Sequence, residues 1–369
     1  MVNCPNFVEE ILVDILLRLP VKSIIRFKAV HSSWLSFLSS KEFTLQHLRR
    51  NKANYSTYKC GFIRVEANQT FGHPSLSFRN LVTATEDGNV VIEEIKEAFR
   101  ETDSGVRVHG SFNGLLLVSI NGHLILWNPS TMEYKRIDIR SLCRYIIIEI
   151  GLGYDELNDS YKIILIHAHL ETITIEVYSM KTNSWKKIYY YYDEFPYILS
   201  QSNQFITLAN GIPHWIVARR IVRPCGNCTK KVVLRFDMID EVFKEVVLPE
   251  ELQCISEGVQ SISMLDGDLC VVASKGGWVM KDYGTAKSWY KLDIDYGFHQ
   301  RHLLHFLPVG FSNDKNQVVV GINRIKWRSY EQAIVIYNKS SNQYTNFVKL
   351  KSNVVSYVET LVSPNNYYN

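Results

Sequence analysis

A repeated strand pair constrains the fold of this chain more than any other feature of its sequence. Each copy consists of an apolar strand, a polar turn and a return strand that carries an aromatic residue. The copies occupy residues 124–137, 175–188, 234–246, 278–292 and 334–348. They follow one another at intervals of about 45 to 60 residues, near the period of β-propeller blades that hold two hairpins each. With a degenerate copy at 60–105, the repeat predicts a kelch-like β-propeller of about six blades; a β-sandwich of two sheets is the alternative.

Aromatic residues and turn dipeptides mark equivalent positions in the copies of the repeat. In four copies the two aromatic residues are seven positions apart, and in the copy at 278–292 Lys281 precedes Trp289 by eight. We expect the first aromatic residues to be equivalent and equally buried on successive sheets; they are Trp127, Tyr178, Phe236 and Tyr337. Dipeptides that favour tight type I′ turns separate several apolar runs, at 113–114, 121–122, 210–211 and 266–267.

The first fifty residues have a helical pattern instead. Apolar residues from Phe7 to Leu19 recur every three or four positions, and Pro20 ends the run because its ring cannot continue a helical hydrogen-bond ladder. Two more short apolar sets follow, which predicts three helices of about ten residues each. So small a unit cannot bury all its apolar side chains alone. The surplus predicts contact with the rest of the chain or with another protein.

Charge is unevenly distributed along the chain. Residues 1–60 hold nine Lys or Arg and four Asp or Glu, whereas the remainder holds 32 and 33. This surplus is too small for typical nucleic-acid binding, and it favours an acidic partner protein for the first segment. No apolar stretch is long enough for a membrane span, and the acidic residues near the N-terminus do not fit a secretory signal. Seven Cys, an odd number, do not indicate a disulfide framework. We expect a cytoplasmic protein, with the nucleus as the alternative.

No motif for bond chemistry stands out. Cys225 and Cys228 have the spacing of a zinc or redox pair, but no second pair follows at a zinc-finger interval, which favours a reduced loop turn. His167 and His169, and the three histidines at 299, 302 and 305, lack a carboxylate partner at a known metal-site spacing. Phosphate-binding, nucleophile-elbow and zinc-protease motifs are missing. We therefore predict no catalytic residue, no cofactor and no metal, and a chain that is not an enzyme.

Residues 7–48, FVEEILVDILLRLPVKSIIRFKAVHSSWLSFLSSKEFTLQHL, resemble the plant F-box. The matching positions are Arg18, Leu19, Pro20, Lys22, Ser23, Arg26, Phe27, Lys28, Val30 and Trp34. Two departures are visible, because Phe7-Val8 stands where the family usually has Leu-Pro, and Ala29 replaces a common Cys. Neither change removes an apolar contact. They bear on how tightly the segment binds.

The body resembles the F-box-associated domain of plants in GSFNGLLLVS (110–119), LWNPSTMEYKRI (126–137), GLGYDELNDSYKII (151–164), VYSMKTNSWKKI (177–188) and NGIPHWI (210–216). The resemblance divides the chain into a small all-α F-box head (1–50), a linker with the degenerate β unit (51–105) and a large all-β domain (106–369). Residues 278–289 and 356–362 are most similar to S-locus F-box proteins. That subgroup implies a non-self S-ribonuclease as substrate, in pollen self-incompatibility.

The family implies a substrate-recognition subunit of a Skp–cullin–F-box (SCF) ubiquitin ligase. The head would bind the Skp-type adaptor, and through it the cullin and RING subunits, while the β domain would bind a protein substrate for ubiquitination and degradation. The expected adaptor-binding residues are Phe7, Ile11, Leu12, Ile15, Leu16, Leu19, Pro20, Val21, Ile25, Phe27, Val30 and Trp34.

Two unusual loops of the body are the candidate substrate-binding sites. One is aromatic (189–197) and the other is basic (219–231), and both are expected to open on the same side. Tyrosine is a favoured anchor because it offers a large area at a small entropic cost. The candidate residues are Tyr190, Tyr192, Tyr197, Arg219, Arg220 and Arg223. Inward packing of the rings, and a merely solvated basic tip, are the competing interpretations.

Two other functions stay open at this point. A β-propeller that binds a ligand without any ligase role would share the fold, and so would a propeller hydrolase with an unrecognised site. Capture of an adaptor would distinguish a ligase subunit from a propeller that only binds a ligand. A convergent cluster of acids or histidines in the central channel would favour the hydrolase.

Overall fold

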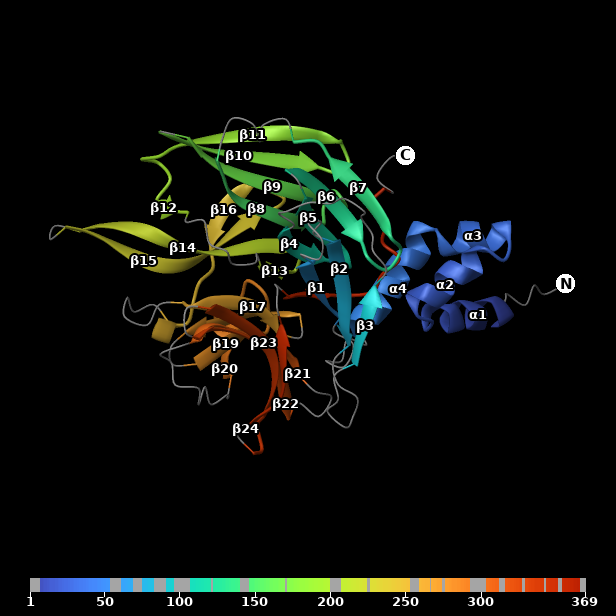
Figure 1. Ribbon diagram of the computed structural model, residues 1–369. Helices are drawn as coiled ribbons and strands as arrows, with labels where there is room; N and C mark the ends of the chain where they lie inside the picture. Colours follow the sequence, from blue (N-terminus) through green and yellow to red (C-terminus); the bar gives the residue numbers. More distant parts are fainter. Residues whose placement is uncertain are drawn as a thin grey trace.

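The computed structural model shows a helical head attached to a ring of β-sheets (Figure 1). It describes residues 7–53, 61–68, 75–82, 91–95, 107–120, 122–139, 146–169, 171–199, 207–223, 226–252, 259–265, 267–273, 276–292, 303–311, 316–326, 329–341, 343–350 and 354–365.

The head contains four helices where the sequence predicted three. They are α1 (Phe7–Leu17), α2 (Val21–Lys28), α3 (Ser32–Leu38) and α4 (Lys41–Ala53). The prediction missed α4 because charged and polar residues dominate it and mask its short apolar face. Phe43, His47 and Leu48 form that face and are buried. No helix in the described part of the chain is long and apolar enough to span a bilayer.

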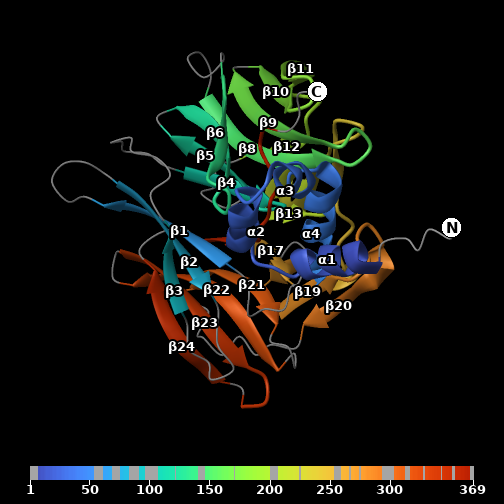
Figure 2. The ribbon, with the colours of Figure 1, turned by 90° about the vertical axis from the view of Figure 1, so that its right-hand side faces the viewer.

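The β domain is a propeller, and the described strands form six antiparallel sheets around a common centre (Figure 2). The first sheet pairs β1 (Gly61–Asn68), β2 (Ser75–Val82) and β3 (Val91–Ile95) with β25 (Val354–Tyr357). The second holds β4 (Arg107–Phe112), β5 (Leu115–Ile120), β6 (His123–Asn128) and β7 (Glu133–Ile137). The third holds β8 (Ile146–Asp155), β9 (Ser160–His169), β10 (Thr172–Ser179) and β11 (Ser184–Tyr191).

The other three sheets follow in chain order. The fourth holds β12 (Tyr197–Ile198), β13 (Thr207–Ala209), β14 (Ile212–Arg223), β15 (Gly226–Asp237) and β16 (Val242–Glu245). The fifth holds β17 (Ser261–Leu265), β18 (Asp268–Ala273), β19 (Gly276–Met280) and β20 (Trp289–Leu292). The sixth holds β21 (Leu303–Phe311), β22 (Gln317–Lys326), β23 (Ser329–Asn338) and β24 (Gln343–Leu350). Two stacked sheets are therefore excluded.

Each repeated hairpin forms the two outer strands of one sheet. The four predicted aromatic positions are all buried, with at most 4% of each residue exposed, and each pairs with its predicted partner across the turn; they are Trp127, Tyr178, Phe236 and Tyr337. In the fifth sheet Met280, and not Lys281, pairs with Trp289. The turn there is longer because it contains a short 3₁₀ helix (Ala286–Ser288).

Neighbouring sheets pack through both faces of their strands. On β9, Ile163 and Leu165 belong to the apolar cluster shared with the second sheet, while Ile164 and Ile166 belong to the cluster shared with the fourth. All four are fully buried. Because successive side chains point to opposite faces, a strand buried on both faces needs this continuous apolar run. Burial of each such side chain contributes about 1.5–3 kcal/mol.

The C-terminal segment 354–365, called the clasp below, closes the ring and joins it to the head. Its strand β25 pairs with β1, which joins the degenerate unit at 61–95 to the last strand of the chain in one sheet. The amide of Asn128 donates hydrogen bonds to the carbonyls of Thr360 (3.0 Å) and Val362 (2.7 Å). Gly114 lies against the clasp, where a Cβ atom would meet Thr360 Oγ1 at 2.5 Å. The predicted type I′ turn explains this glycine, since Asn113 and Gly114 both have positive φ.

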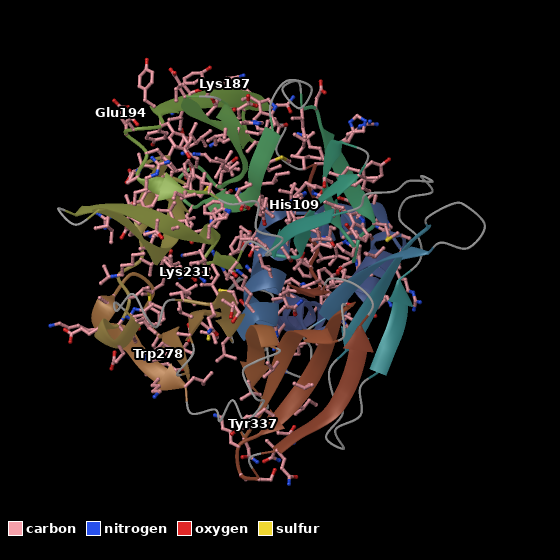
Figure 3. All side chains as sticks on the ribbon, turned by 60° about the vertical axis from the view of Figure 1, so that its left-hand side comes forward. His109, Lys187, Glu194, Lys231, Trp278 and Tyr337 are labelled. Carbon is pink, nitrogen blue, oxygen red and sulfur yellow. The ribbon has the colours of Figure 1, made fainter. Side chains whose placement is uncertain are left out.

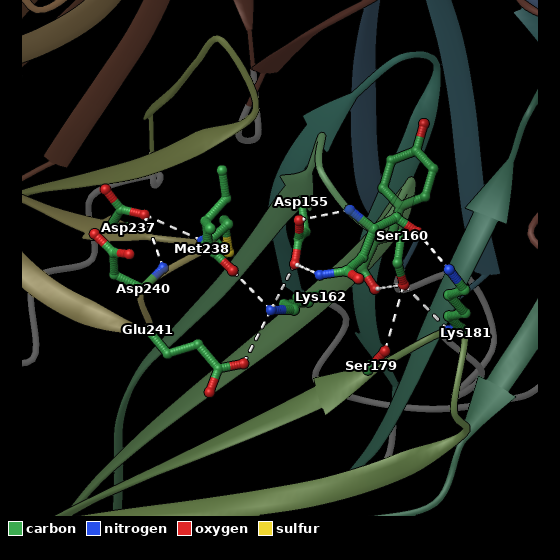
Figure 4. Close-up of polar contacts among 12 residues, drawn as sticks. Asp155, Ser160, Lys162, Ser179, Lys181, Asp237, Met238, Asp240 and Glu241 are labelled. Carbon is green, nitrogen blue, oxygen red and sulfur yellow. Dashed lines mark hydrogen bonds and ion pairs between the residues drawn. The ribbon is translucent and has the colours of Figure 1, made fainter.

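A buried lysine joins the third and fourth sheets (Figure 4). Lys162 Nζ lies 2.8 Å from Asp155 Oδ2 and 2.9 Å from Glu241 Oε1, and it donates to the carbonyl of Met238 at 2.6 Å. Burial alone would raise the pKa of Asp155, but hydrogen bonds from Lys162 and Asn158 outweigh it and hold that pKa below its usual value. The lysine charge therefore stabilises both carboxylates away from water.

Replacement of this lysine should destabilise the propeller strongly. Lys162→Ala leaves Asp155 buried without its counter-ion, and we expect a loss of about 3–5 kcal/mol in the free energy of unfolding. Denaturant titration of the purified chain measures it. Lys181→Ala is the control, since Lys181 is exposed and bonds only to the Asn158 carbonyl through its side chain. Equal losses in both variants would contradict the role given to Lys162.

A buried histidine should make the stability depend on pH. His214 bonds to the Ile212 carbonyl and the Tyr283 hydroxyl (2.8 and 2.9 Å), and burial lowers its pKa to about 4. The unfolded chain therefore binds the proton first as the pH falls. The stabilisation is complete above pH 6.5 and is lost progressively towards pH 4, by roughly 3 kcal/mol. His214→Gln should show a shallower dependence in unfolding curves over this range.

Candidate protein-interaction surfaces

The head presents apolar side chains to solvent on α1, on α3 and in the turn between α2 and α3. We call this set the head surface, and between 39% and 66% of each residue is exposed; its members are Ile11, Leu12, Ile15, Val30, Leu35 and Phe37. Exposed large apolar side chains that form a patch often mark an interaction site, because monomeric proteins rarely expose such patches. Helix α4 lies between these helices and the ring (Figures 1 and 2). The head surface is therefore open to a partner.

The structure sorts the predicted adaptor-binding residues into three groups. Ile11, Leu12, Ile15, Pro20 and Val30 are exposed, and Leu19, Ile25, Phe27 and Trp34 are half-buried against the core of the head. Leu16 and Val21 are 3% and 1% exposed and form that core, so their predicted contact with the adaptor stays a prediction. The side chain of Phe7 lies outside the described residues.

Two members of the head surface escaped the sequence prediction. Leu35 and Phe37 belong to α3, whose inward side is occupied by Trp34 and Leu38. The available signal was the count of apolar residues, since SSWLSFL holds more of them than one inward stripe of a seven-residue helix can bury.

Contacts on α4 and the clasp fix the head to the propeller. Leu361 of the clasp packs into the core of the head, and the Asn51 amide donates to the Glu359 carbonyl at 3.2 Å. Lys41 forms an ion pair with Asp159 in the β8–β9 turn. Lys52 Nζ lies 4.9 Å from the ring centre of Phe112. The head is therefore attached to the second sheet, to the third sheet and to the clasp.

The two candidate substrate loops lie together, at the end of the molecule opposite the head. Strands β14 and β15 are twelve residues each and extend away from the head (Figure 1). The loop after β11 returns along them, because β12 pairs Tyr197 with Arg219 and Ile198 with Ala218. Figure 3 shows Glu194 and Lys231 on this end of the molecule. The expectation that both loops open on one side is therefore confirmed.

The basic and aromatic side chains of this end contact one another directly. The guanidinium of Arg220 lies 4.2 Å from the ring centre of Tyr192 and donates to that residue's carbonyl at 3.3 Å. Arg219 forms an ion pair with Glu245 at 3.3 Å. Burial and the nearby Glu245 raise the pKa of Tyr197 to about 12. We call this region, from Tyr189 to Tyr197 with the β14–β15 hairpin, the distal surface.

Not every candidate residue is placed for recognition. Tyr190 and Tyr197 are half-buried, because both rings pack on the buried Phe195, and the side chain of Arg223 lies outside the described residues. The most exposed rings are those of Tyr189 and Tyr191, at 66% each, which the sequence prediction omitted. The alternation of β11 was the available signal, since the inward Ile188 forces Tyr189 and Tyr191 outward.

The described residues contain no group of three His, Cys, Asp or Glu side chains that could hold a metal ion. His167 is buried, with Nε2 3.9 Å from Glu176. The side chains of His169, Cys228 and His305, and all of Cys225, His299 and His302, lie outside the described residues. The predictions for them stay predictions.

Comparison with known proteins agrees with both parts of this architecture. Residues 5–46 match the F-box domain, and residues 68–364 match the F-box associated beta propeller domain. The chain belongs to the F-box-associated β-propeller family. The family match begins at the last residue of β1 and so includes β2, β3 and β25 of the first sheet.

Relatives with the same two parts occur in Arabidopsis thaliana. The F-box protein CPR1 is 26% identical over 355 residues, which cover 86% of this chain and 80% of that protein. An F-box/kelch-repeat protein is 26% identical over 389 residues, covering 98% and 96%. The similarity therefore extends over head and propeller together.

Proposed function

We propose that this chain is the substrate-recognition subunit of an SCF ubiquitin ligase, in which the head surface binds the Skp-type adaptor and the distal surface binds a protein substrate. The observation that carries the proposal is the head surface itself: an F-box unit leaves six large apolar side chains exposed on α1, on α3 and in the turn between α2 and α3. Buried against an adaptor, side chains of this size supply the anchors of a stable interface.

The chain acts by position and not by bond chemistry. Its head and its distal surface lie at opposite ends of the structure, so a substrate bound at one end is held close to the ligase subunits bound at the other. Proximity of this kind converts a bimolecular encounter into an effectively intramolecular step. The cullin and RING subunits enter the proposal through the adaptor.

The positive charge of the β14–β15 hairpin restricts the kinds of protein that the distal surface can bind. The S-locus resemblance implied a ribonuclease, and a basic ribonuclease would meet like charges on the β14–β15 hairpin, which carries Arg219, Arg220, Lys230 and Lys231. Like charges across an interface disfavour binding. The self-incompatibility role stays a prediction from sequence, and the distal surface favours other substrates.

Adaptor capture tests the head surface. Ile15→Asp places a charge on an exposed apolar position, at 51%, and should weaken capture of a Skp-type adaptor by roughly tenfold or more, because an unpaired charge would be buried in the interface. Ile239→Asp is the matched control, since Ile239 is 52% exposed in the β15–β16 turn. Equal capture by wild type and Ile15→Asp would contradict the proposal and favour a propeller that binds a ligand outside a ligase.

Substrate capture tests the distal surface. The double variant with Tyr192→Ala and Arg220→Ala removes a stacked pair that should anchor the interface, at a cost above about 1 kcal/mol for each truncated anchor. Proteins retained by the wild type should be lost, while adaptor capture is unchanged. Tyr290→Ala, on the fifth sheet and 42% exposed against 40% for Tyr192, is the control. Loss of the same proteins in that control would place the substrate site elsewhere.

A further inference from the structure

The β14–β15 hairpin has an open edge along β15. Strand β16 pairs only with residues 234–237 of β15, and the Val246 amide adds one hydrogen bond to the Val233 carbonyl at 2.9 Å. Beyond this point, no strand in the described part of the chain pairs with residues 226–232 on that side. The hairpin thus continues past its own sheet with one edge uncovered.

The register identifies which backbone groups face the open edge. The carbonyl of Val233 points towards β16, and in an extended strand every second residue directs its N–H and C=O to the same side. Thr229 and Lys231 therefore present both groups to the open edge, while Lys230 bonds inward to β14. The other edge agrees, since the Arg220 amide of β14 donates outward to Pro196 at 2.8 Å.

Positive charge flanks this edge on both faces of the hairpin. Lys230 lies directly across from Arg219, and the facing pair Ala218–Lys231 puts the second lysine on the opposite face. Like charges directly opposite each other destabilise a strand pair. Glu245 compensates Arg219, but within the described residues neither lysine forms an ion pair. Lysines beside an open edge disfavour pairing with neutral or basic strands. An acidic strand would instead be attracted to them.

We propose that the open edge of β15 binds an extended segment rich in Asp and Glu from the substrate, by strand addition. The inference rests on the proposed function and names the chemistry of its substrate. The outward N–H and C=O groups of Thr229 and Lys231 supply the backbone hydrogen bonds. Acidic side chains on alternate faces of the added strand meet Lys230 on one face and Lys231 on the other. A cross-strand neighbour lies about 5 Å away, within reach of these charges.

A synthetic peptide tests the inference on the purified full chain. The peptide places adjacent pairs of Asp and Glu between Val and Thr residues, and its partner replaces them by Asn and Gln. Fluorescence anisotropy should show binding of the acidic peptide only, weakening as salt is raised. Hydrogen exchange at the Thr229 and Lys231 amides should slow when the peptide binds.

Two kinds of variant separate backbone pairing from charge. Thr229→Pro removes an outward N–H to which no described strand bonds, and the double variant with Lys230→Gln and Lys231→Gln removes the charge while keeping the strand. Each should weaken peptide binding by roughly tenfold or more. Thr229→Ala and Lys287→Gln, an exposed lysine of the fifth sheet, should bind as the wild type does. The lysine variant keeps the test decisive even if the proline disturbs the hairpin.

Several outcomes would overturn the inference. They are equal binding of the Asn and Gln peptide, binding unaffected by the lysine variant, tighter binding of a short single-stranded oligonucleotide than of the acidic peptide, and a concentration-dependent dimer that Thr229→Pro abolishes. Adaptor capture by the same variants is measured in a separate experiment, so that the ligase role and the strand-addition site are tested independently. A wild type that binds the peptide but captures no adaptor would contradict the proposed ligase role and leave the strand-addition site standing.

Discussion

The amide of Asn128 donates both its hydrogens to carbonyls of the clasp, and closure of the ring and attachment of the head depend on these hydrogen bonds. Through them, a segment from the far end of the chain is held against the second sheet, pairs with β1 and places Leu361 in the core of the head. Ring closure and attachment of the head are thus one structural event. The cost of leaving these buried polar groups without partners makes the arrangement specific.

Local features of the fold could be predicted from the sequence, whereas contacts between distant segments could not. The five hairpins were visible because an apolar strand, its turn and its aromatic return strand are adjacent in the chain. Closure of the first sheet by β25 joins residues almost three hundred positions apart, such as Gly61 and Tyr357, and no local pattern encodes it. Helix α4 was missed for a related reason, since its few apolar residues are buried by the clasp and the propeller, which are distant in the sequence.

The interaction surfaces show a second limit. Helix α1 is apolar on more than one side, so its periodicity could identify the helix but could not tell that Leu16 faces inward and Ile15 outward. The aromatic loop posed the same difficulty in strand form. Four consecutive tyrosines contain no contrast of their own between polar and apolar positions. The strand alternation from Ile188 turns Tyr190 inward, and its contact with Phe195 fixes that arrangement. In each case the deciding contact comes from another element.

The clasp also imposes an order on biosynthesis. Leu361 leaves the ribosome after every strand of the propeller, yet it belongs to the core of the F-box head, which emerges first. Domains usually begin to fold in the order in which they are made. Here the head must wait, incompletely packed, until the ring is ready to close. A chain interrupted during translation would carry neither a finished ring nor a finished head, so a fully packed head would be limited to molecules that have been synthesised through the clasp.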